Sequence, residues 1–365
     1  MRVIIIGGIA AGMSAAAKLR RVRQDAKIVI YEKQDYVSFG ACGLPYYVGD
    51  FFEEHERMIV RTPEQMIKKG IDVRTNHEVI HVDAKLKKIT VRNDKTNEMF
   101  EDSYDRLMIA TGASPIMPPI EGLELTHVSV LRTLQDGLKV KEWLQKEEIK
   151  KVVIVGAGFI GLEVVEAVKH MGKEAIVIQL GDRVLKGPFD PEITNQIEQE
   201  LQDQGVTLHL NTKVVRLEGD SSVRSVITDQ GKIDADMVII ATGVRPNTSF
   251  LADTGIKMLK NGAIVIDQEG RTSIEDIYAA GDCATIPHYL KEEPAYIPLA
   301  TTANKLGRIV GENLGGAHIT FEGTLGSGCV SHCNLCEDDY HTTWHVRSML
   351  CTIIFKNMGC IKCCW

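Results

Sequence analysis

The residue with the clearest capacity for chemistry is Cys42, which lies in the glycine-rich segment SFGACGLPY at residues 38–46. At a predicted helix start, the helix dipole favours the thiolate form of such a cysteine. A dithiol centre needs a second cysteine nearby, and Val37, Pro45 and Tyr47 occupy the candidate positions. We therefore predict that Cys42 works alone or with an external thiol, passing through a mixed disulfide or a sulfenic acid. An inert buried cysteine is the alternative.

A glycine fingerprint follows the apolar strand predicted at residues 152–155. Gly156, Gly158 and Gly161 form a complete G-x-G-x-x-G between that strand and a predicted helix. The first glycine permits a tight turn, the second lets the backbone approach a pyrophosphate, and the third allows close helix–strand packing. The helix N-terminus then favours the anion. The pattern predicts a dinucleotide site, with a structural glycine turn as the alternative.

The chain opens with an incomplete copy of this fingerprint, GGIAAG at residues 7–12. Ile9 stands where the second glycine is expected, but small residues flank it and leave room for a phosphate. Glu32 ends the next predicted strand, where a carboxylate accepts the ribose hydroxyls of an adenosine. A solvated strand-end charge is the alternative for Glu32.

Gln179 occupies the position in the second unit that corresponds to Glu32 in the first. A neutral amide does not repel a 2′-phosphate, and Arg183 and Lys186 follow closely. NADPH is therefore not excluded, and both NADH and NADPH stay open. Arg183 can equally be an exposed turn residue.

The order of predicted elements indicates an α/β fold. Each fingerprint is followed by a second strand, at residues 27–31 and 174–180, and each unit closes on an apolar strand ending in Ala-Thr-Gly. Continuous apolar strands are typical of parallel sheets covered on both faces. We predict two Rossmann-like domains, with residues 116–243 inserted between 1–115 and 244–325. A helix is expected between Asp136 and Lys150, a strand at 263–267 and a helix at 300–314.

Composition excludes several classes of protein. The net charge of −7 argues against general nucleic-acid binding, which needs a basic surface. The apolar runs are strand-sized, so we expect no membrane span, and no signal peptide is recognised. Before residue 329 the only cysteines are Cys42 and Cys283, which indicates a reduced, cytoplasmic protein. Cys283 is expected to be buried and inert.

Together, these motifs resemble those of the pyridine nucleotide-disulfide oxidoreductases over about residues 1–328. The run IYAAGD at 277–282 completes the pattern. The loop around Cys42 is similar to the single-cysteine branch, and most similar to coenzyme A-disulfide reductases. NADH oxidases, NADH peroxidases and persulfide reductases share much of it. The resemblance implies FAD in the first domain and NADH or NADPH in the second.

The resemblance also implies roles for individual residues. Those expected to hold FAD are Gly7, Gly8, Ala11, Gly12, Glu32, Lys33, Thr111, Gly112, Asp282 and Ala300. Those expected to frame NAD(P)H are Gly156, Gly158, Ile160, Gly161, Glu163, Gln179 and Gly243. Asp282 is expected to accept from the ribityl chain, and the helix that begins at Ala300 to direct its dipole at the flavin.

A cluster of cations on the first predicted helix gives coenzyme A binding a physical basis. The pyrophosphate and 3′-phosphate of coenzyme A need such cations, although a solvated helix face is the alternative. The cluster consists of Lys18, Arg20, Arg21 and Arg23. The coenzyme A contacts that the resemblance implies are Ser14, Lys18, Arg21 and Ser38.

The chain departs from the family at residues 326–365, a cysteine-rich segment that stands where the family has its dimerisation domain. We interpret it as the product of a shifted reading frame or truncation. Alternatives are a zinc site on the pairs Cys333-x-x-Cys336 and Cys360-x-x-Cys363, or a native disordered tail. We predict no metal site and no stable family homodimer.

Three functional hypotheses follow. In the first, electrons from NAD(P)H pass through FAD to Cys42, which reduces coenzyme A disulfide. In the second, Cys42 carries a sulfenate or persulfide in an NADH oxidase, a peroxidase or a persulfide reductase. The third, from a different class, is a flavin-binding remnant left inactive by loss of the dimer domain.

Overall fold

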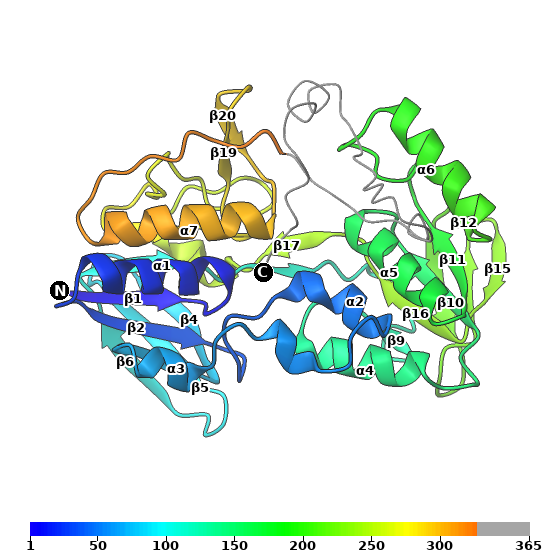
Figure 1. Ribbon diagram of the computed structural model, residues 1–365, viewed down its shortest axis with the longest axis horizontal. Helices are drawn as coiled ribbons and strands as arrows, with labels where there is room; N and C mark the ends of the chain where they lie inside the picture. Colours follow the sequence, from blue (N-terminus) through cyan, green and yellow to red (C-terminus); the bar gives the residue numbers. More distant parts are fainter. Residues whose placement is uncertain (327–365) are drawn as a thin grey trace, which may run out of the picture. The chain divides into compact units, whose positions relative to one another are not determined.

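The computed structural model describes residues 1–326, which divide into two compact units (Figure 1). The first unit contains Met1–Cys42, Glu54–Ser114 and Val244–Gly326, and the second contains Gly43–Glu53 and Pro115–Gly243. The predicted α/β class with two Rossmann-like units is confirmed. One segment departs from the expected boundaries, because Gly43–Glu53 packs with the second unit rather than the first.

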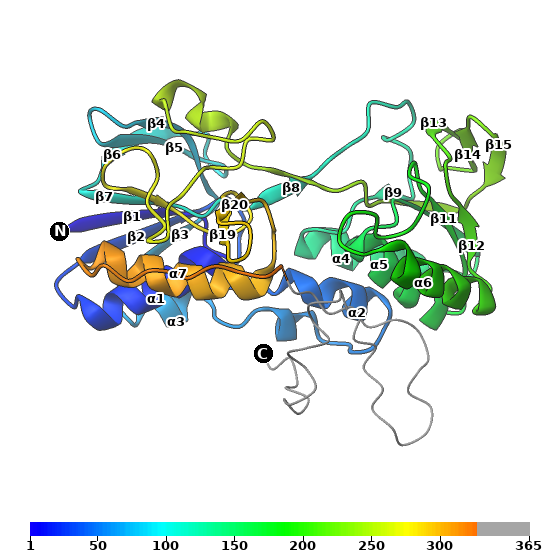
Figure 2. The same cartoon turned by 90° about the horizontal axis from the view of Figure 1, so that it is seen from above.

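A five-stranded parallel sheet in the order β18-β7-β1-β2-β3 forms the centre of the first unit. Helices α1 and α7 cover one face, and the antiparallel sheet β4-β5-β6 covers the other (Figure 2). The parallel strands are β1 (Arg2–Ile6), β2 (Lys27–Glu32), β3 (Ile71–Thr75), β7 (Arg106–Ile109) and β18 (Ile277–Ala279). The other elements named here are α1 (Ala10–Val22), α7 (Ala300–Leu314), β4 (His77–Asp83), β5 (Lys88–Asn93) and β6 (Met99–Ser103).

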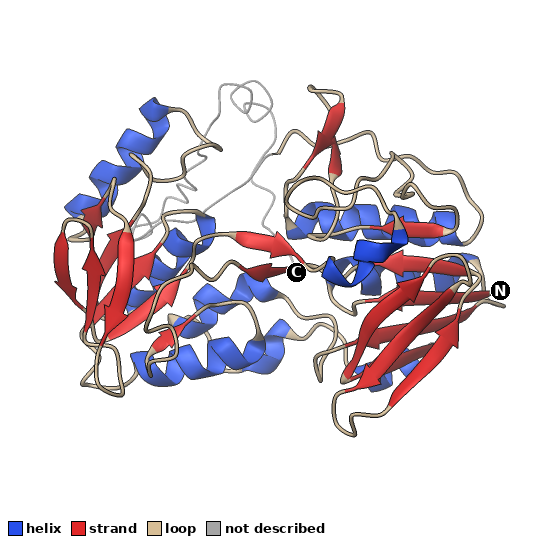
Figure 3. Cartoon of the chain, turned by 180° about the vertical axis from the view of Figure 1, so that it is seen from behind, coloured by secondary structure: helices blue, strands red, loops and turns tan. Residues whose placement is uncertain are grey.

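The second unit repeats this design with the parallel order β12-β11-β10-β16-β9. Figure 3 shows its strands in red and its helices in blue. Its parallel strands are β9 (Val128–Ser129), β10 (Lys151–Val155), β11 (Glu174–Ile178), β12 (Thr207–His209) and β16 (Met237–Ile240). Its helices are α2 (Leu44–Val48), α4 (Leu134–Leu144), α5 (Phe159–His170) and α6 (Pro191–Asp203). A separate antiparallel sheet consists of β13 (Val214–Glu218), β14 (Ser225–Thr228) and β15 (Gly231–Asp234).

Shorter elements connect these layers. They are η1 (Ala41–Gly43), η2 (His55–Met58), α3 (Pro63–Ile67), β8 (Ala113–Pro115), β17 (Val244–Pro246), η3 (Ser249–Thr254), β19 (Ile286–His288) and β20 (Glu293–Ala295).

Two predicted elements differ from the structure. The helix expected from Asp136 begins at Leu134, because Thr133 and Asp136 form a capping box that fixes its first turn. The strand expected at 263–267 is wrong. Ile264 makes only isolated bridges, with Met258 and Ala284, so the segment does not form a strand.

Candidate active site

Cys42 is exposed and lies in the 3₁₀ turn η1, directly before helix α2. Backbone hydrogen bonds tie its loop to the turn that follows β1: the Ser38 N–H donates to the Gly8 carbonyl oxygen at 2.8 Å. The Gly40 N–H donates to the Met58 carbonyl oxygen at 2.7 Å, which holds the loop on its other side. The first unit thus brings the candidate redox loop and the first glycine turn together.

The first glycine turn needs its glycines for steric reasons. Gly7 has a φ of 105°, and a Cβ there would lie 2.2 Å from the Ala110 carbonyl oxygen. A Cβ on Gly12 would lie 1.9 Å from the Gly7 carbonyl oxygen, so only glycine lets α1 start this close to β1. Helix α1 begins at Ala10, and its N-cap residue Ile9 makes no side-chain cap, which leaves the helix N-terminus suited to an anion.

Glu32 is buried beneath this turn, where its carboxylate accepts from the Gly8 N–H at 2.7 Å and from the Gln34 N–H at 2.9 Å. Burial raises the pKa of Glu32 above its ordinary value, although the backbone donors oppose the shift. The carboxylate therefore already orients the turn, and each oxygen keeps a lone pair for a ribose hydroxyl.

The second unit reproduces these contacts at matching positions. Gly156 has a φ of 111°, and a Cβ on Gly161 would lie 2.0 Å from the Gly156 carbonyl oxygen. Gln179 takes the place of Glu32, because its Oε1 accepts from the Ala157 N–H at 3.1 Å. Gly158 is different: a Cβ there would meet nothing within 4 Å. Folding therefore gives no steric reason for this glycine, whereas a pyrophosphate lying against it does.

The ends of β7 and β18 add further candidate flavin residues in the first unit. Thr111 Oγ1 donates to the Asn247 carbonyl oxygen at 2.7 Å, and Asn247 Nδ2 donates to the Thr111 carbonyl oxygen at 3.0 Å. The Asn247 N–H also donates to the Gly112 carbonyl oxygen at 3.0 Å. Asn247 was missed by the sequence analysis, since its partners lie far away along the chain and only the preceding Pro246 signalled a turn.

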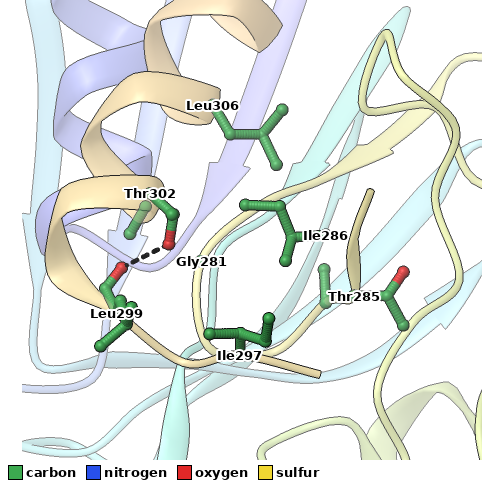
Figure 4. Close-up of a pocket in the computed structure, with 9 residues that line it drawn as sticks. Gly281, Thr285, Ile286, Ile297, Leu299, Thr302 and Leu306 are labelled. Atoms are coloured by element: carbon green, nitrogen blue, oxygen red, sulfur yellow. Dashed lines mark hydrogen bonds between the residues drawn. The ribbon is translucent and has the colours of Figure 1, made fainter. Parts of the chain in front are cut away.

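A small pocket lies at the start of α7, and its lining includes Gly281 and Leu299, the sequence neighbours of the predicted flavin residues Asp282 and Ala300 (Figure 4). Gly281, next to Asp282, lines it together with Ile286, Ile297 and Leu306. Leu299 holds the N-cap position of α7 without a capping side chain, and Ala300 is exposed. The uncapped N-terminus of a long helix suits an electron-rich acceptor such as the flavin pyrimidine edge. The first unit therefore fits FAD.

The predicted coenzyme A residues are already engaged within the first unit. Ser14 Oγ donates to Asn304 Oδ1 at 2.8 Å, and Lys18 pairs with Glu312, both partners being on α7. Arg21 is exposed, and its Nε donates a hydrogen bond to the Ala17 carbonyl oxygen, one turn earlier in α1. Arg20 has a structural role, since its guanidinium donates to three backbone carbonyl oxygens, of Gln24, Ala26 and Gly70.

Several of the predicted cofactor-binding residues are exposed. Among them are Lys33, Ile160 and Gly243, and Gly243 has a φ of 105°.

Cys283 is fully buried, and its thiol donates to the carbonyl oxygens of Ile109 and Ala280. Burial raises the pKa of Cys283 to about 11, so it stays a neutral thiol.

Glu163 on α5 is half-buried, and burial together with the neighbouring Glu166 raises its pKa to about 7. Its folded-state pKa exceeds its unfolded value, so the stability that protonated Glu163 provides is present at low pH and lost as pH rises toward 7. We expect Glu163→Gln to stabilise the protein by about 2 kcal/mol at pH 8, and to have little effect at pH 4.

Urea unfolding of the FAD-loaded protein, followed by circular dichroism at both pH values, checks this. Glu147 is exposed and serves as the control, because Glu147→Gln should leave stability unchanged at either pH. Equal stability of Glu163→Gln and the wild type at pH 8 would contradict the expectation.

Within residues 1–326, no helix combines the length and the apolar character that a membrane span requires. No group of three or more histidine, cysteine or acidic side chains in that range is placed to hold a metal ion. The two Cys-x-x-Cys pairs lie outside the described residues.

Comparisons with known proteins show the family. The model of the family described as pyridine nucleotide-disulphide oxidoreductase matches residues 1–307. The NAD(P)H sulfur oxidoreductase (CoA-dependent) of Pyrococcus abyssi is 40% identical over 326 residues, which cover 89% of this chain and 72% of that protein. The coenzyme A disulfide reductase of Staphylococcus aureus is 32% identical over 332 residues, covering 90% and 74%. The NADH-bound structure of the water-forming NADH oxidase of Lactobacillus brevis has a TM-score of 0.87 at 32% identity, covering 91% and 73%.

Two glycine turns on two parallel sheets, with an exposed thiol in a loop that is hydrogen-bonded to the first turn, are features of an oxidoreductase that uses two dinucleotides. The chain belongs to the pyridine nucleotide-disulphide oxidoreductase family, as its motifs predicted. Its cofactors are FAD and NADH or NADPH.

Proposed function

We propose that this protein reduces a small-molecule disulfide, coenzyme A disulfide, with electrons from NADH or NADPH and with Cys42 as its redox-active thiol. The observation that carries the proposal is the placement of Cys42. Its thiol is exposed, and its loop is hydrogen-bonded to Gly8 in the glycine turn that would hold FAD. The names of the Pyrococcus abyssi and Staphylococcus aureus relatives support coenzyme A as the thiol concerned.

The chemistry of the proposal is a thiol–disulfide exchange. The Cys42 thiolate attacks one sulfur of the substrate disulfide, forms a mixed disulfide and releases one thiolate, which takes a proton from solvent. Two electrons from NAD(P)H then cleave the mixed disulfide, releasing the second thiol and restoring the Cys42 thiolate. FAD, if held at the first glycine turn, would supply the redox chemistry that links the nicotinamide to sulfur. Overall, NAD(P)H, a proton and one disulfide give NAD(P)⁺ and two thiols.

We propose that the residues predicted from the sequence bind the two cofactors and the substrate. Gly7, Gly8 and Gly12 would accommodate the FAD pyrophosphate and Gly158 that of NAD(P)H. Ser14, Lys18, Arg21 and Ser38 would bind coenzyme A, and Lys18 would then share its charge between Glu312 and a phosphate. Gln179 supports use of both nucleotides, since its neutral amide orients the turn without repelling a 2′-phosphate.

A second candidate is oxygen or persulfide reduction through an oxidised form of Cys42. The similarity to a water-forming NADH oxidase favours it, and the sulfur oxidoreductase relative is compatible with a persulfide. No observation favours the inactive flavin-binding alternative.

The acceptor distinguishes these candidates. NADH and NADPH consumption should be measured anaerobically with coenzyme A disulfide, and then with oxygen or with coenzyme A persulfide as the only acceptor. The proposal expects the highest kcat/KM with the disulfide. Faster turnover with oxygen or the persulfide would reject it in favour of the second candidate.

A further inference from the structure

The segment that follows Cys42 has an unusual attachment. Residues Gly43–Glu53, which we call the anchor segment, pack with the second unit, although Cys42 itself belongs to the first. Helix α2 of this segment contacts both α4 and α5 (Figure 1). Because Gly43 directly follows Cys42, whatever fixes the anchor segment also restricts the position of the thiol.

Lys141 on α4 is the main polar attachment. Its side chain is buried, and its ammonium lies 2.7 Å from Asp50 Oδ1. The same ammonium donates to the Phe52 carbonyl oxygen at 3.2 Å and lies 4.3 Å from the centre of the Tyr47 ring. A buried ammonium needs partners, and all three of these belong to the anchor segment.

His170 at the end of α5 is the second attachment. Its Nδ1 lies 2.6 Å from the Gly49 carbonyl oxygen, so it is the protonated nitrogen that donates there. Its ring stacks on Phe51, with centroids 4.1 Å apart and an interplanar angle of 20°. A hydrogen bond is directional, so it fixes the register of the anchor segment more strictly than apolar contacts alone.

Packing leaves little room for the anchor segment to shift. Leu44 is buried against Gly137, where a Cβ would lie 2.4 Å from Leu44 Cδ2. A Cβ on Gly49 would lie 2.9 Å from the Ala167 Cα. These glycines let α2 lie close against α4 and α5, within reach of Lys141 and His170.

We propose that Lys141 and His170 are positioning residues that hold the anchor segment and thereby orient the Cys42 thiol for attack on a disulfide. The proposal rests on the proposed function and extends it to two residues distant in sequence from the cysteine. Neither residue acts on the substrate. Their role is to restrict Cys42 to the productive orientation, and misplacement by about 1 Å can slow a reaction by about 100-fold.

The test replaces Lys141 with methionine, which keeps the length of the side chain. The side chain of Asp50 is 43% exposed, so losing its partner leaves no buried charge and the variant should fold. The matched control is Lys139→Met, because Lys139 lies on the same helix and contacts the Trp143 ring but not the anchor segment. Lys141→Arg keeps the cation and should restore part of the lost function.

Three readouts are needed. The first is kcat for disulfide reduction, expected to fall about 10-fold or more with KM for NAD(P)H unchanged. The second is NAD(P)H–ferricyanide activity, which bypasses Cys42 and should not change. The third is hydrogen exchange in peptides covering residues 43–53, which should be faster in Lys141→Met and in His170→Ala.

The outcomes separate this proposal from the proposed function. Unchanged disulfide kcat in Lys141→Met, or an equal loss in Lys139→Met, would overturn the positioning role. Equal loss of ferricyanide activity would overturn it too, since the damage would then not be specific to Cys42. If the wild type reduces no disulfide, the proposed function fails. The anchoring role is then tested by hydrogen exchange alone, and unchanged exchange of residues 43–53 in both Lys141→Met and His170→Ala would overturn it.

Discussion

Replacing Cys42 by serine is expected to lower kcat for disulfide reduction by about 1,000-fold or more, while NAD(P)H–ferricyanide activity stays intact. Serine keeps the size of the side chain, but its hydroxyl neither ionises near neutral pH nor forms a mixed disulfide. The glycine turns that would hold the two nucleotides do not depend on the thiol. Parallel assays of both activities, with FAD content measured by absorbance, check this.

The matched control is Cys283→Ser in the same unit. That thiol is buried and donates to backbone carbonyl oxygens, a role that a hydroxyl can take over. The Cys283→Ser variant should therefore retain disulfide reduction. Full disulfide turnover by Cys42→Ser would show that the thiol is not on the electron path.

Gly158→Ala is expected to raise KM for NADH and NADPH by at least about 10-fold, equivalent to 1.4 kcal/mol of lost binding. The backbone of Gly158 is extended (φ −84°, ψ −173°), which alanine adopts without strain, and the added Cβ meets nothing within 4 Å. The fold should therefore tolerate the methyl group, whereas a pyrophosphate approaching the turn should not. Thermal melts and nucleotide titrations of the same samples measure both effects.

Gly161→Ala is the contrasting variant for this experiment. Its Cβ would lie 2.0 Å from the Gly156 carbonyl oxygen. We therefore expect the free energy of unfolding to fall by about 1–3 kcal/mol, rather than a selective loss of nucleotide binding. If Gly158→Ala binds NAD(P)H as the wild type does, the second glycine turn is not the nucleotide site. If it unfolds, the steric account of Gly158 is wrong.

The glycine turns and their acidic or amide partners were predictable because local geometry dictates them. Gly7 and Gly156 need a positive φ, and Glu32 and Gln179 end the next strand, where each side chain meets the turn. Parallel strands bring such positions to one sheet edge wherever the pattern occurs. The hydrogen bond from Ser38, in the Cys42 loop, to Gly8 follows from the same geometry, since this loop leaves the end of β2.

Other features depend on contacts that no local pattern encodes. Asn247 bonds to Thr111 across 136 residues, and Lys141 reaches Asp50 from a helix whose own sequence is ordinary. The cations of the first helix were identified as one basic cluster, yet Lys18 is paired with Glu312 and Arg20 donates to backbone carbonyl oxygens. A cation in sequence can serve a ligand or the fold, and only tertiary packing decides between them.

The most direct test of the account is to trap the sulfur intermediate on Cys42. The protein should be reduced with NADPH, freed of nucleotide, mixed with coenzyme A disulfide without oxygen, quenched and digested for peptide mass spectrometry. We predict a coenzyme A adduct on the peptide that contains Cys42, formed with release of one equivalent of thiol and lost when NADPH is added. An unmodified Cys42, or one that carries only a sulfenic acid while the disulfide is nevertheless consumed, would contradict the account.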